Sequence, residues 1–390
     1  MRIAVIAPRY GLQVLGGAEK QARGFVETVA QKGEEVEVWT TCAQSHYTWE
    51  NFYAPGVENN AGITVRRFPI THWEKERWAE MEVRLATQGF LTAEESYSWL
   101  SSGPHSVPLY KYARSHSADF DVVVALPYTM PLIHYAAWSA LERVVLWPCL
   151  HDEPYAYLEP VRLLLESVWG VMFNSPEEAN LALQRLRIRP RHHAILGEGV
   201  TLSVNASATL EQEQPGTFVL YIGRLEEGKN LHVLYDYMQH YFQASGEIRL
   251  VVIGDGPVKP PDHPAFHYLG FVSEELKAAL CRAALVLCQP SLLESFSLTI
   301  MEAWLAGRPV LVHEDCAVTR GHVQRSRGGL WFRSYEDFAL ALDRFRASPE
   351  LSARMGENGH HYVLQNYTWE AVVNRFLALY QSWREPVENK

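Results

Sequence analysis

The sequence predicts an α/β protein of two domains, each built on a mostly parallel sheet that helices cover on both faces. The chain has 390 residues, more than a single domain usually contains. Short runs rich in valine and isoleucine alternate with longer helical patterns, which is typical of such sheets. This alternation occurs twice, on either side of a polar segment at residues 201–216. We therefore expect domains at residues 1–205 and 206–367.

The first half opens with a strand pattern and continues as alternating strands and helices. Helical patterns include Ala18–Gln31 and Pro176–Leu186. The predicted strands are Ile3–Ala7, Val36–Thr40, Thr64–Phe68, Val122–Leu126, Val144–Trp147 and Gly170–Phe173.

The alternation starts again after the polar segment. Its helical patterns lie around Asn230–Phe242, Glu274–Ala284 and Thr299–Ala306. The chain closes with an amphipathic pattern, Trp369–Trp383, so we expect residues 368–390 to form a C-terminal helix. The predicted strands of this half are Phe218–Ile222, Arg249–Ile253, Phe266–Leu269, Leu285–Cys288 and Pro309–Val312.

An aromatic-rich insert at about 71–117 interrupts the first half. Aromatic side chains at this density are more often part of a core than of a binding surface. A contribution to an acceptor site or to a membrane contact is the alternative. The aromatic residues are Trp73, Trp78, Phe90, Tyr97, Trp99, Tyr110 and Tyr112.

Composition and charge exclude several classes. The net charge of −10 argues against nucleic acid as a partner, because polyanion binding needs a concentrated basic face. No apolar stretch is long enough to span a membrane, and the start of the chain lacks the layout of a signal peptide. We expect a soluble, cytoplasmic protein. The cysteines have neither metal-site spacing nor an even number, so we expect reduced thiols: Cys42, Cys149, Cys281, Cys288 and Cys316.

Two loops carry the first candidate site residues. Gly16-Gly17 lies where the first strand passes into a helix, and such a junction lets backbone N–H groups approach an anion. A plain tight turn is the alternative for this pair. In the second half, Arg224 and Lys229 follow the first strand, where open α/β sheets bind ligands, and the two cations suit a diphosphate. Surface ion pairs with neighbouring glutamates are the alternative there.

The segment from Pro290 to Val310 is the richest in candidate site residues. Glu294 is predicted to lie in the loop after a strand, and Glu302 in the early turns of the helix that follows. A loop carboxylate beside free helix N–H groups can hold sugar hydroxyls while those N–H groups hold a phosphate. A carboxylate further along can accept two hydrogen bonds from a ribose diol. A solvated helix face is the alternative for two glutamates at this spacing.

The Glu294-x7-Glu302 pair, its flanks and the Gly223-Arg224-x4-Lys229 loop resemble retaining glycosyltransferases of sequence family four. The resemblance implies the GT-B fold, in which two Rossmann-like domains face each other across a cleft and the C-terminal helix crosses back to the first domain. It extends over nearly the whole chain and is strongest from 218 to 310. Further stretches that resemble the family are Val252–Pro257, Leu269–Ser273, Asn366–Trp369 and Cys149–Glu153.

The resemblance implies roles for residues of the second domain. Arg224 and Lys229 would neutralise the donor diphosphate, and Glu302 would bind the ribose hydroxyls. Glu294 would hold the transferred sugar. The backbone N–H groups of Phe296, Ser297 and Leu298 would hold the distal phosphate, while Phe271 and Val272 would lie near the nucleobase.

In the first domain, the resemblance implies that Gly16 and Gly17 approach the phosphate and that His151 faces the transferred sugar. A lone histidine after a strand is otherwise more often structural. The implied catalytic set is Glu294, His151, Arg224 and Lys229.

Two observations qualify the resemblance. The family usually has glycines around the phenylalanine that follows the first glutamate, whereas this chain has Ser295 and Ser297, which lose cost-free access to positive φ. This departure bears on the identity of the transferred sugar more than on the activity. Asp119-Phe120-Asp121 has the Asp-x-Asp spacing of metal-dependent transferases, but two solvated aspartates before a strand are ordinary, so we expect no metal.

The function implied by the resemblance is retaining transfer of a hexose from a nucleotide-diphosphate sugar, with no other cofactor. Glycans, lipid-linked glycans and small molecules are the candidate acceptors, and synthesis of cell-surface polysaccharide or glycoconjugate is the implied role. Peripheral contact with the inner membrane face is left open. The alternatives are a nucleotide-sugar epimerase, a sugar phosphorylase or a non-catalytic protein that binds sugar nucleotides.

Overall fold

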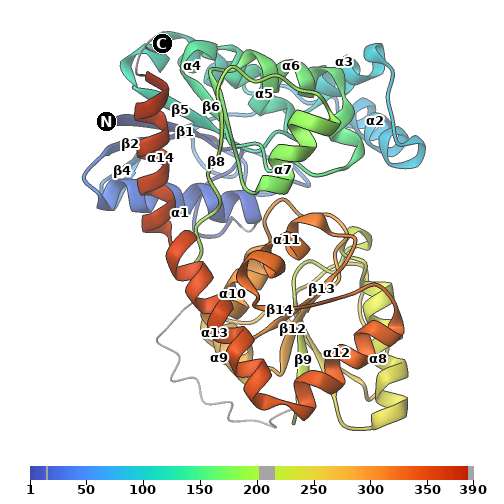
Figure 1. Cartoon of the computed structure of the whole chain (residues 1–390). Helices are drawn as coiled ribbons and strands as arrows, with labels where there is room; N and C mark the ends of the chain where they lie inside the picture. Colours follow the sequence, from blue (N-terminus) through green and yellow to red (C-terminus); the bar gives the residue numbers. More distant parts are fainter. Residues whose placement is uncertain (15, 202–215, 385–390) are drawn as a thin grey trace. The chain divides into compact units, whose positions relative to one another are not determined.

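The computed structural model describes residues 1–14, 16–201 and 216–384, which divide into two compact units (Figure 1). One unit contains Met1–Gly199 and Trp369–Lys390, and the other contains Val200–Thr368. Each unit is built on a sheet of mainly parallel strands with helices around it, so the predicted fold class is confirmed. The predicted boundary at 205/206 lies outside the described residues.

The sheet of the first unit has the order β3-β4-β2-β1-β5-β6-β7-β8, and only the β3–β4 pair is antiparallel. Each strand predicted in this half is present. The sequence analysis missed β3, which is polar and fully exposed, and β8, which has only 3 residues. The strands are β1 (Arg2–Ile6), β2 (Glu35–Thr41), β3 (Gly56–Asn60), β4 (Ile63–Phe68), β5 (Val122–Ala125), β6 (Val144–Leu146), β7 (Gly170–Phe173) and β8 (His193–Ile195).

Helices cover both faces of this sheet. Alternate residues of β1 show the two layers: Ile3 and Val5 pack with α1 and α14, whereas Ala4 and Ile6 pack on the side of α3 to α6. The predicted helix at 176–186 is divided into α7 and a π-helical turn, η4 (Leu181–Arg185). The α-helices are α1 (Gly17–Gln31), α2 (Lys75–Gln88), α3 (Ala93–Ser102), α4 (Val107–His116), α5 (Pro131–Trp138), α6 (Glu159–Ser167), α7 (Pro176–Asn180) and α14 (Trp369–Arg384).

The aromatic-rich insert forms α2, α3 and α4. Trp99 is fully buried, and Tyr110 and Tyr112 pack against the same core. Phe90 and Tyr97 are exposed, at 62% and 43%. Most of the aromatic side chains of the insert therefore pack in or against the core, as expected, and two of them face solvent.

Helix α14 completes the core of the first unit. The ring of Trp369 fills the space beside Gly24 and Gly199, where an added Cβ would come within 2.2 and 2.1 Å of it. Further along the helix, the rings of Phe25 and Phe376 meet edge to face at 4.9 Å. The last described turns of the chain are thus an integral layer of this unit.

The sheet of the second unit has the order β11-β10-β9-β12-β13-β14, and all its pairs are parallel. Each strand predicted in this half is present. The sequence analysis missed β14, a four-residue strand that begins with a glycine. The strands are β9 (Phe218–Ile222), β10 (Arg249–Ile253), β11 (Phe266–Gly270), β12 (Val286–Gln289), β13 (Val310–His313) and β14 (Gly329–Phe332).

Helices also cover both faces of the second sheet. Phe218, Leu220 and Ile222 of β9 pack on the side of α9, α10 and α13, and the intervening Val219 and Tyr221 pack on the side of α8 and α12. Helices α11, α12 and α13 were not predicted. The helices of this unit are α8 (Leu231–Ser245), α9 (Glu274–Ala283), α10 (Leu298–Leu305), α11 (Ala317–Ser326), α12 (Tyr335–Ala347) and α13 (Pro349–Asn366).

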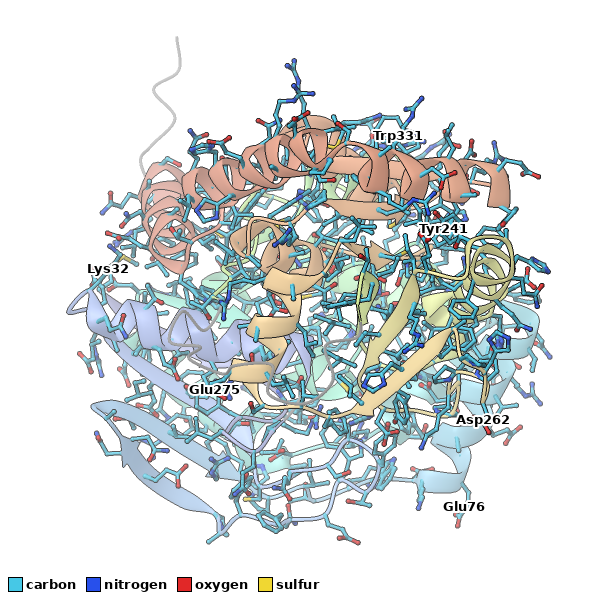
Figure 2. All side chains as sticks on the ribbon, turned by 90° about the horizontal axis from the view of Figure 1, so that it is seen from below. Lys32, Glu76, Tyr241, Asp262, Glu275 and Trp331 are labelled. Carbon is cyan, nitrogen blue, oxygen red and sulfur yellow. The ribbon has the colours of Figure 1, made fainter. Side chains whose placement is uncertain are left out.

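Charged side chains lie on the surface of both units. Charged side chains such as Lys32, Glu76, Asp262 and Glu275 are exposed (Figure 2). In the ranges 1–14, 16–201 and 216–384, none of the helices combines the length and apolar character that a membrane span requires. The five cysteines are free thiols.

Candidate active site

The second unit has its topological switch point between β9 and β12. From β9 the chain moves outward to β10 and β11, then returns to the other side of β9 and forms β12, β13 and β14 in turn. Open parallel sheets bind ligands outside the carboxyl ends of the strands that flank such a point. The two loops there, 223–230 after β9 and 290–297 after β12, hold most of the predicted site residues.

Glycines bring the loop after β10 against the loop after β9. A Cβ on Gly254 would lie 1.8 Å from the carbonyl oxygen of Gly223, and one on Gly256 would lie 2.4 Å from that of Leu225. The backbone N–H of Leu225 donates to the carbonyl of Asp255 at 2.9 Å. This close backbone approach explains the glycines of the Val252–Pro257 motif and fixes the course of the chain next to Arg224.

Lys229 and Glu294 join the two loops of the switch point. The ammonium of Lys229 lies 2.8 Å from Oε1 of Glu294, and these side chains are only 20% and 11% exposed. Asn230 adds a second link, because its Nδ2 donates to the carbonyl of Pro290 at 3.2 Å. The structure thus brings together a cation and a carboxylate that the sequence placed in separate motifs.

Arg224 is more open to solvent. Its side chain is 66% exposed, and Nη1 lies 3.2 Å from Oε1 of Glu226. The surface ion pair that was the alternative interpretation is therefore present for Arg224. Lys229 instead pairs with Glu294 on the other loop, and not with Glu226 or Glu227, which are near it in the sequence.

Helix α10 begins at the same edge of the sheet. Ser297, its N-cap, has φ 78° and ψ 83°, a left-handed conformation that costs a non-glycine residue about 1 kcal/mol. The side chain of Ser297 itself makes no capping hydrogen bond to the first turn of α10. The preceding Phe296 is 1% exposed and meets the rings of His322 and Tyr367 edge to face. A buried anchor thus holds the start of the helix, whose backbone N–H groups can donate hydrogen bonds to an anion.

Glu302 lies inside the unit and pairs with a residue that was not predicted. Its Oε1 accepts a hydrogen bond from Nζ of Lys277 on α9 at 2.8 Å, and both side chains are less than a tenth exposed. Burial opposes the charge on Lys277, but Glu302 and Glu274 outweigh it, so the pKa of Lys277 is raised. The alternative interpretation of Glu302 as part of a solvated helix face is wrong.

The two residues expected near the nucleobase follow β11. Phe271 is 72% exposed, and Val272 packs against the core that α9 and α10 share. Strand β11 is at the edge of the sheet, two strands from β9. An exposed ring at this edge is available for stacking on a planar ligand.

In the first unit, Gly16 and Gly17 follow β1, beside a second switch point between β1 and β5. Gly16 has φ 156°, and an added Cβ would lie 2.0 Å from a carboxylate oxygen of Glu19. Gly17 is the first residue of α1, and nothing described lies within 4 Å of a Cβ placed there. The conformation therefore requires glycine at 16, and the space around 17 is open.

His151 follows β6, two strands from β1 in the sheet. Its side chain is 33% exposed, and Nδ1 lies 3.4 Å from Oε1 of Glu153. That carboxylate oxygen also accepts a hydrogen bond from the hydroxyl of Tyr128 at 2.8 Å. The imidazole is thus held by a neighbouring carboxylate while part of the ring faces solvent.

Sequence reasoning missed the partners of the predicted carboxylate and imidazole. Lys277 stands three residues after Glu274 on a helix, which is the pattern of an exposed ion pair, and only the packing of α9 on α10 buries it. Tyr128 gave no signal, because a tyrosine in a loop is common. Glu153 lies within the predicted histidine loop, and its adjacency to His151 was the one available hint.

The Asp119-Phe120-Asp121 segment has a structural role. The carboxylate of Asp121 accepts the backbone N–H of Arg2 at 2.8 Å and lies 3.6 Å from Nη1 of Arg384. It therefore ties the start of β1 and the end of α14 to the start of β5.

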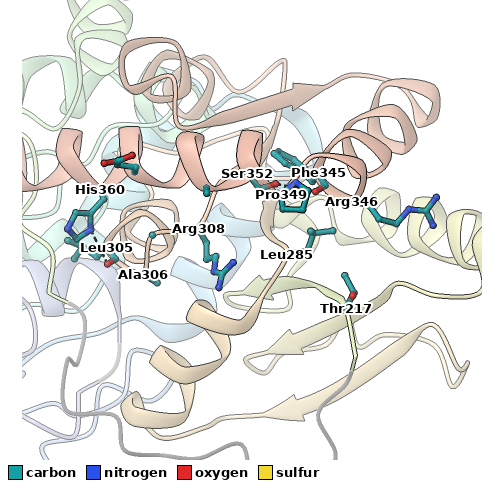
Figure 3. Close-up of a pocket in the computed structure, with 13 residues that line it drawn as sticks. Thr217, Leu285, Leu305, Ala306, Arg308, Phe345, Arg346, Pro349, Ser352 and His360 are labelled. Carbon is teal, nitrogen blue, oxygen red and sulfur yellow. Dashed lines mark hydrogen bonds between the residues drawn. The ribbon is translucent and has the colours of Figure 1, made fainter.

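A groove of about 770 Å³ lies at the amino ends of the strands of the second sheet, opposite to the carboxyl ends described above (Figure 3). Thr217, Leu285 and Arg308 line it just before β9, β12 and β13. The predicted donor residues all follow the carboxyl ends of the strands. The groove is therefore separate from the candidate site.

Comparisons with known proteins agree with this geometry. Residues 206–362 match the family described as Glycosyl transferases group 1. The chain is 26% identical to a D-inositol 3-phosphate glycosyltransferase of Streptomyces scabiei over 91% of its length and 84% of that protein.

Two solved structures share the fold over almost their full length. The sucrose-phosphate synthase of Thermosynechococcus elongatus is 19% identical with a TM-score of 0.72, and 98% of each chain is covered. The Anabaena protein HepE, solved in complex with UDP and glucose, is 15% identical with a TM-score of 0.70, over 97% of this chain and 99% of that one. The matches support a glycosyltransferase with the GT-B fold.

Proposed function

We propose that this glycosyltransferase with the GT-B fold is a retaining, metal-independent enzyme that transfers a hexose from a nucleotide-diphosphate sugar. The observation that carries the proposal is the Lys229–Glu294 pair at the switch point of the second sheet, beside the start of α10. A cation, a carboxylate and helix N–H groups at one sheet edge match the chemistry of a sugar diphosphate. The HepE structure with UDP and glucose supports a donor of this class.

The reaction breaks the bond between the anomeric carbon and the phosphate oxygen. Negative charge develops on the leaving diphosphate, and Arg224, Lys229 and the N–H groups at the start of α10 stabilise it without a metal. The acceptor oxygen forms its bond to the anomeric carbon on the face that the phosphate leaves. The acceptor proton passes to the departing phosphate oxygen, so all atoms and charges balance. Glu294 holds the sugar hydroxyls in this scheme.

Glu302 binds the ribose in the same proposal. Lys277 occupies one side of its carboxylate at 2.8 Å, which leaves acceptor capacity for two hydroxyl donors. In this proposal, the exposed ring of Phe271 stacks on the nucleobase. As the resemblance implies, Gly16 and Gly17 of the first unit approach the phosphate, and His151 faces the transferred sugar.

The acceptor is a glycan, a lipid-linked glycan or a small molecule, and the cytoplasm is the proposed compartment. A relative named for D-inositol 3-phosphate supports a small hydroxylated acceptor. A phosphatidyl-myo-inositol mannosyltransferase of Mycobacterium leprae, which is 28% identical over 43% of this chain, supports a lipid-linked one. Phe90 and Tyr97, the exposed aromatic residues of the insert, are candidates for an acceptor or membrane contact.

A thermal-shift screen against UDP-glucose, UDP-N-acetylglucosamine, GDP-mannose and ADP-glucose tests the donor assignment. We expect one nucleotide family to stabilise the wild-type protein, and Arg224→Ala and Glu294→Gln to lose most of that shift. Absence of any shift would reject the proposal. Incubation of that donor alone separates the alternatives, because an epimerase converts the sugar without an acceptor and a phosphorylase requires inorganic phosphate. A binding protein would show the shift and no turnover with any acceptor.

A further inference from the structure

The loop that carries His151 rests on a buried polar network in the first unit. Cys149 has φ 58°, a left-handed conformation that surrounding contacts must hold in place. Its Sγ donates to Oε1 of Gln21 on α1 at 3.0 Å. The amide Nε2 of Gln21 donates in turn to Oδ1 of Asn174, which also accepts the indole N–H of Trp147 at 2.6 Å. This network connects α1, the helix that starts at Gly17, with the exits of β6 and β7.

Glu178 is an acidic residue of this region. It lies on α7, is 1% exposed, and its Oε1 accepts the backbone N–H of Leu150 at 2.5 Å. Its Oε2 accepts the backbone N–H of Asn174. One carboxylate therefore clamps the backbone of the residue directly before His151 to the backbone at the end of β7.

Burying a carboxylate costs free energy unless the groups around it compensate for the loss of its hydration. Burial raises the pKa of Glu178 to about 8, against the two backbone donors and His151, which lower it. A neutral apolar side chain in the same place would avoid this cost. The two hydrogen bonds from the backbone to Glu178 compensate for this cost. They hold the loop in place and thereby fix the position of His151.

We propose that Glu178 is a positioning residue that holds the His151 loop through the backbone N–H of Leu150. The inference rests on the proposed role of His151 in transfer. Glu178 itself contacts neither donor nor acceptor in this proposal. It fixes the loop so that the imidazole, oriented by Glu153, is presented without reorganisation during the reaction.

Glu178→Gln is the decisive variant, because an amide keeps the size but presents an N–H₂ group to one of the two backbone donors. It is compared with His151→Ala and with the double variant. Two controls isolate the effect: Glu142→Gln removes a carboxylate that is 88% exposed, and Val161→Ala weakens the same unit by shortening a fully buried core side chain. The rate of nucleoside diphosphate release is measured with the donor found in the screen. The NMR signal of the His151 ring C–H reports the loop without any reaction.

We expect Glu178→Gln to lower kcat by roughly tenfold to a hundredfold, with little change in KM for the donor. The His151 signal should shift in Glu178→Gln and stay unchanged in both controls. The double variant should be no slower than His151→Ala, because both changes remove the same contribution.

Other outcomes separate the two hypotheses. A loss in Glu178→Gln no greater than in Val161→Ala, with an unmoved His151 signal, would overturn the positioning role. Multiplying losses in the double variant would also overturn it. Normal turnover in His151→Ala would instead reject the proposed role of His151, even where the NMR signal shows that Glu178 holds the loop.

Discussion

The ammonium of Lys229 and the carboxylate of Glu294 form an ion pair at 2.8 Å that joins the loops after the two central strands of the second sheet. Arg224, on the same loop as Lys229, points to solvent with 66% of its side chain exposed. These two cations were predicted to share one role. Their surroundings imply that they differ in what they contribute to stability.

Lys229→Met should destabilise the second unit and also reduce transfer. It leaves the carboxylate of Glu294 mostly buried without its cation, which we expect to cost about 2 kcal/mol. Arg224→Ala should change stability by less than about 0.5 kcal/mol, because its ion pair is exposed. Both should lower turnover by roughly a hundredfold if both stabilise the leaving diphosphate. Urea unfolding and steady-state kinetics measure the two effects, and equal stability losses would contradict the structural distinction.

Ser297→Gly should stabilise the protein. Ser297 stands at φ 78°, where a glycine has no steric penalty, so relief of strain is expected to add about 1 kcal/mol. Ser295→Gly is the matched control, because Ser295 is not among the residues with positive φ, so glycine there relieves no backbone strain and adds freedom to the unfolded chain. Thermal unfolding of both variants decides the matter, and a lower Tm for Ser297→Gly would show that its hydroxyl is worth more than the strain.

The sequence predicted most of the strands and the ends of the strands that carry the site, because these follow from patterns within short windows. Phe218–Ile222 and the loop behind it are an example: an apolar run ends, and cations follow. Pairings between distant segments could not be predicted in this way. The burial of Lys277 depends on how α9 packs on α10, and the clamp by Glu178 depends on strands β6 and β7 being neighbours in the sheet.

Some of the elements that were not predicted carry a local signal in the sequence, and others do not. Helix α12 begins with a capping box, Ser334 and Asp337, which is visible in the sequence. Strand β3, in contrast, has the polar residues of a loop, and only its pairing with β4 makes it a strand. The left-handed backbone of Ser297 runs against the conformational preference of serine, so residue type alone argued against it.

Lys277→Met should weaken nucleotide binding through Glu302. Without the ammonium at 2.8 Å, the buried carboxylate loses its cationic partner and is expected to change rotamer, and so to lose part of its capacity to accept ribose hydroxyls. We expect roughly a tenfold increase in Kd for the nucleotide chosen in the screen, measured by calorimetry. Glu274→Gln is the control, because Glu274 also contacts Lys277 but is 58% exposed. Similar affinities for the wild type and Lys277→Met would exclude a role of this pair in ribose binding.

The first unit should lose stability in acid because it buries a neutral histidine. His105 is 6% exposed, its Nδ1 lies 2.7 Å from the hydroxyl of Tyr110, and the rings of His72 and Tyr135 face it. Burial lowers the pKa of His105 to about 4, against backbone carbonyls that raise it and with a small contribution from His72. In the unfolded chain the same imidazole titrates near its ordinary value of about 6.5.

The sign of the effect follows from these two values. Between about pH 6.5 and pH 4, the unfolded chain binds a proton at this site and the folded unit does not, so unfolding becomes easier as the pH falls. The stability present above pH 6.5 should decrease by roughly 3 kcal/mol at pH 4 from this residue. Urea unfolding at several pH values should show a shallower decrease for His105→Gln, whereas His193→Gln, at an exposed position, should follow the wild type. Parallel curves for all three proteins would mean that His105 takes up its proton in the folded unit at its ordinary pKa.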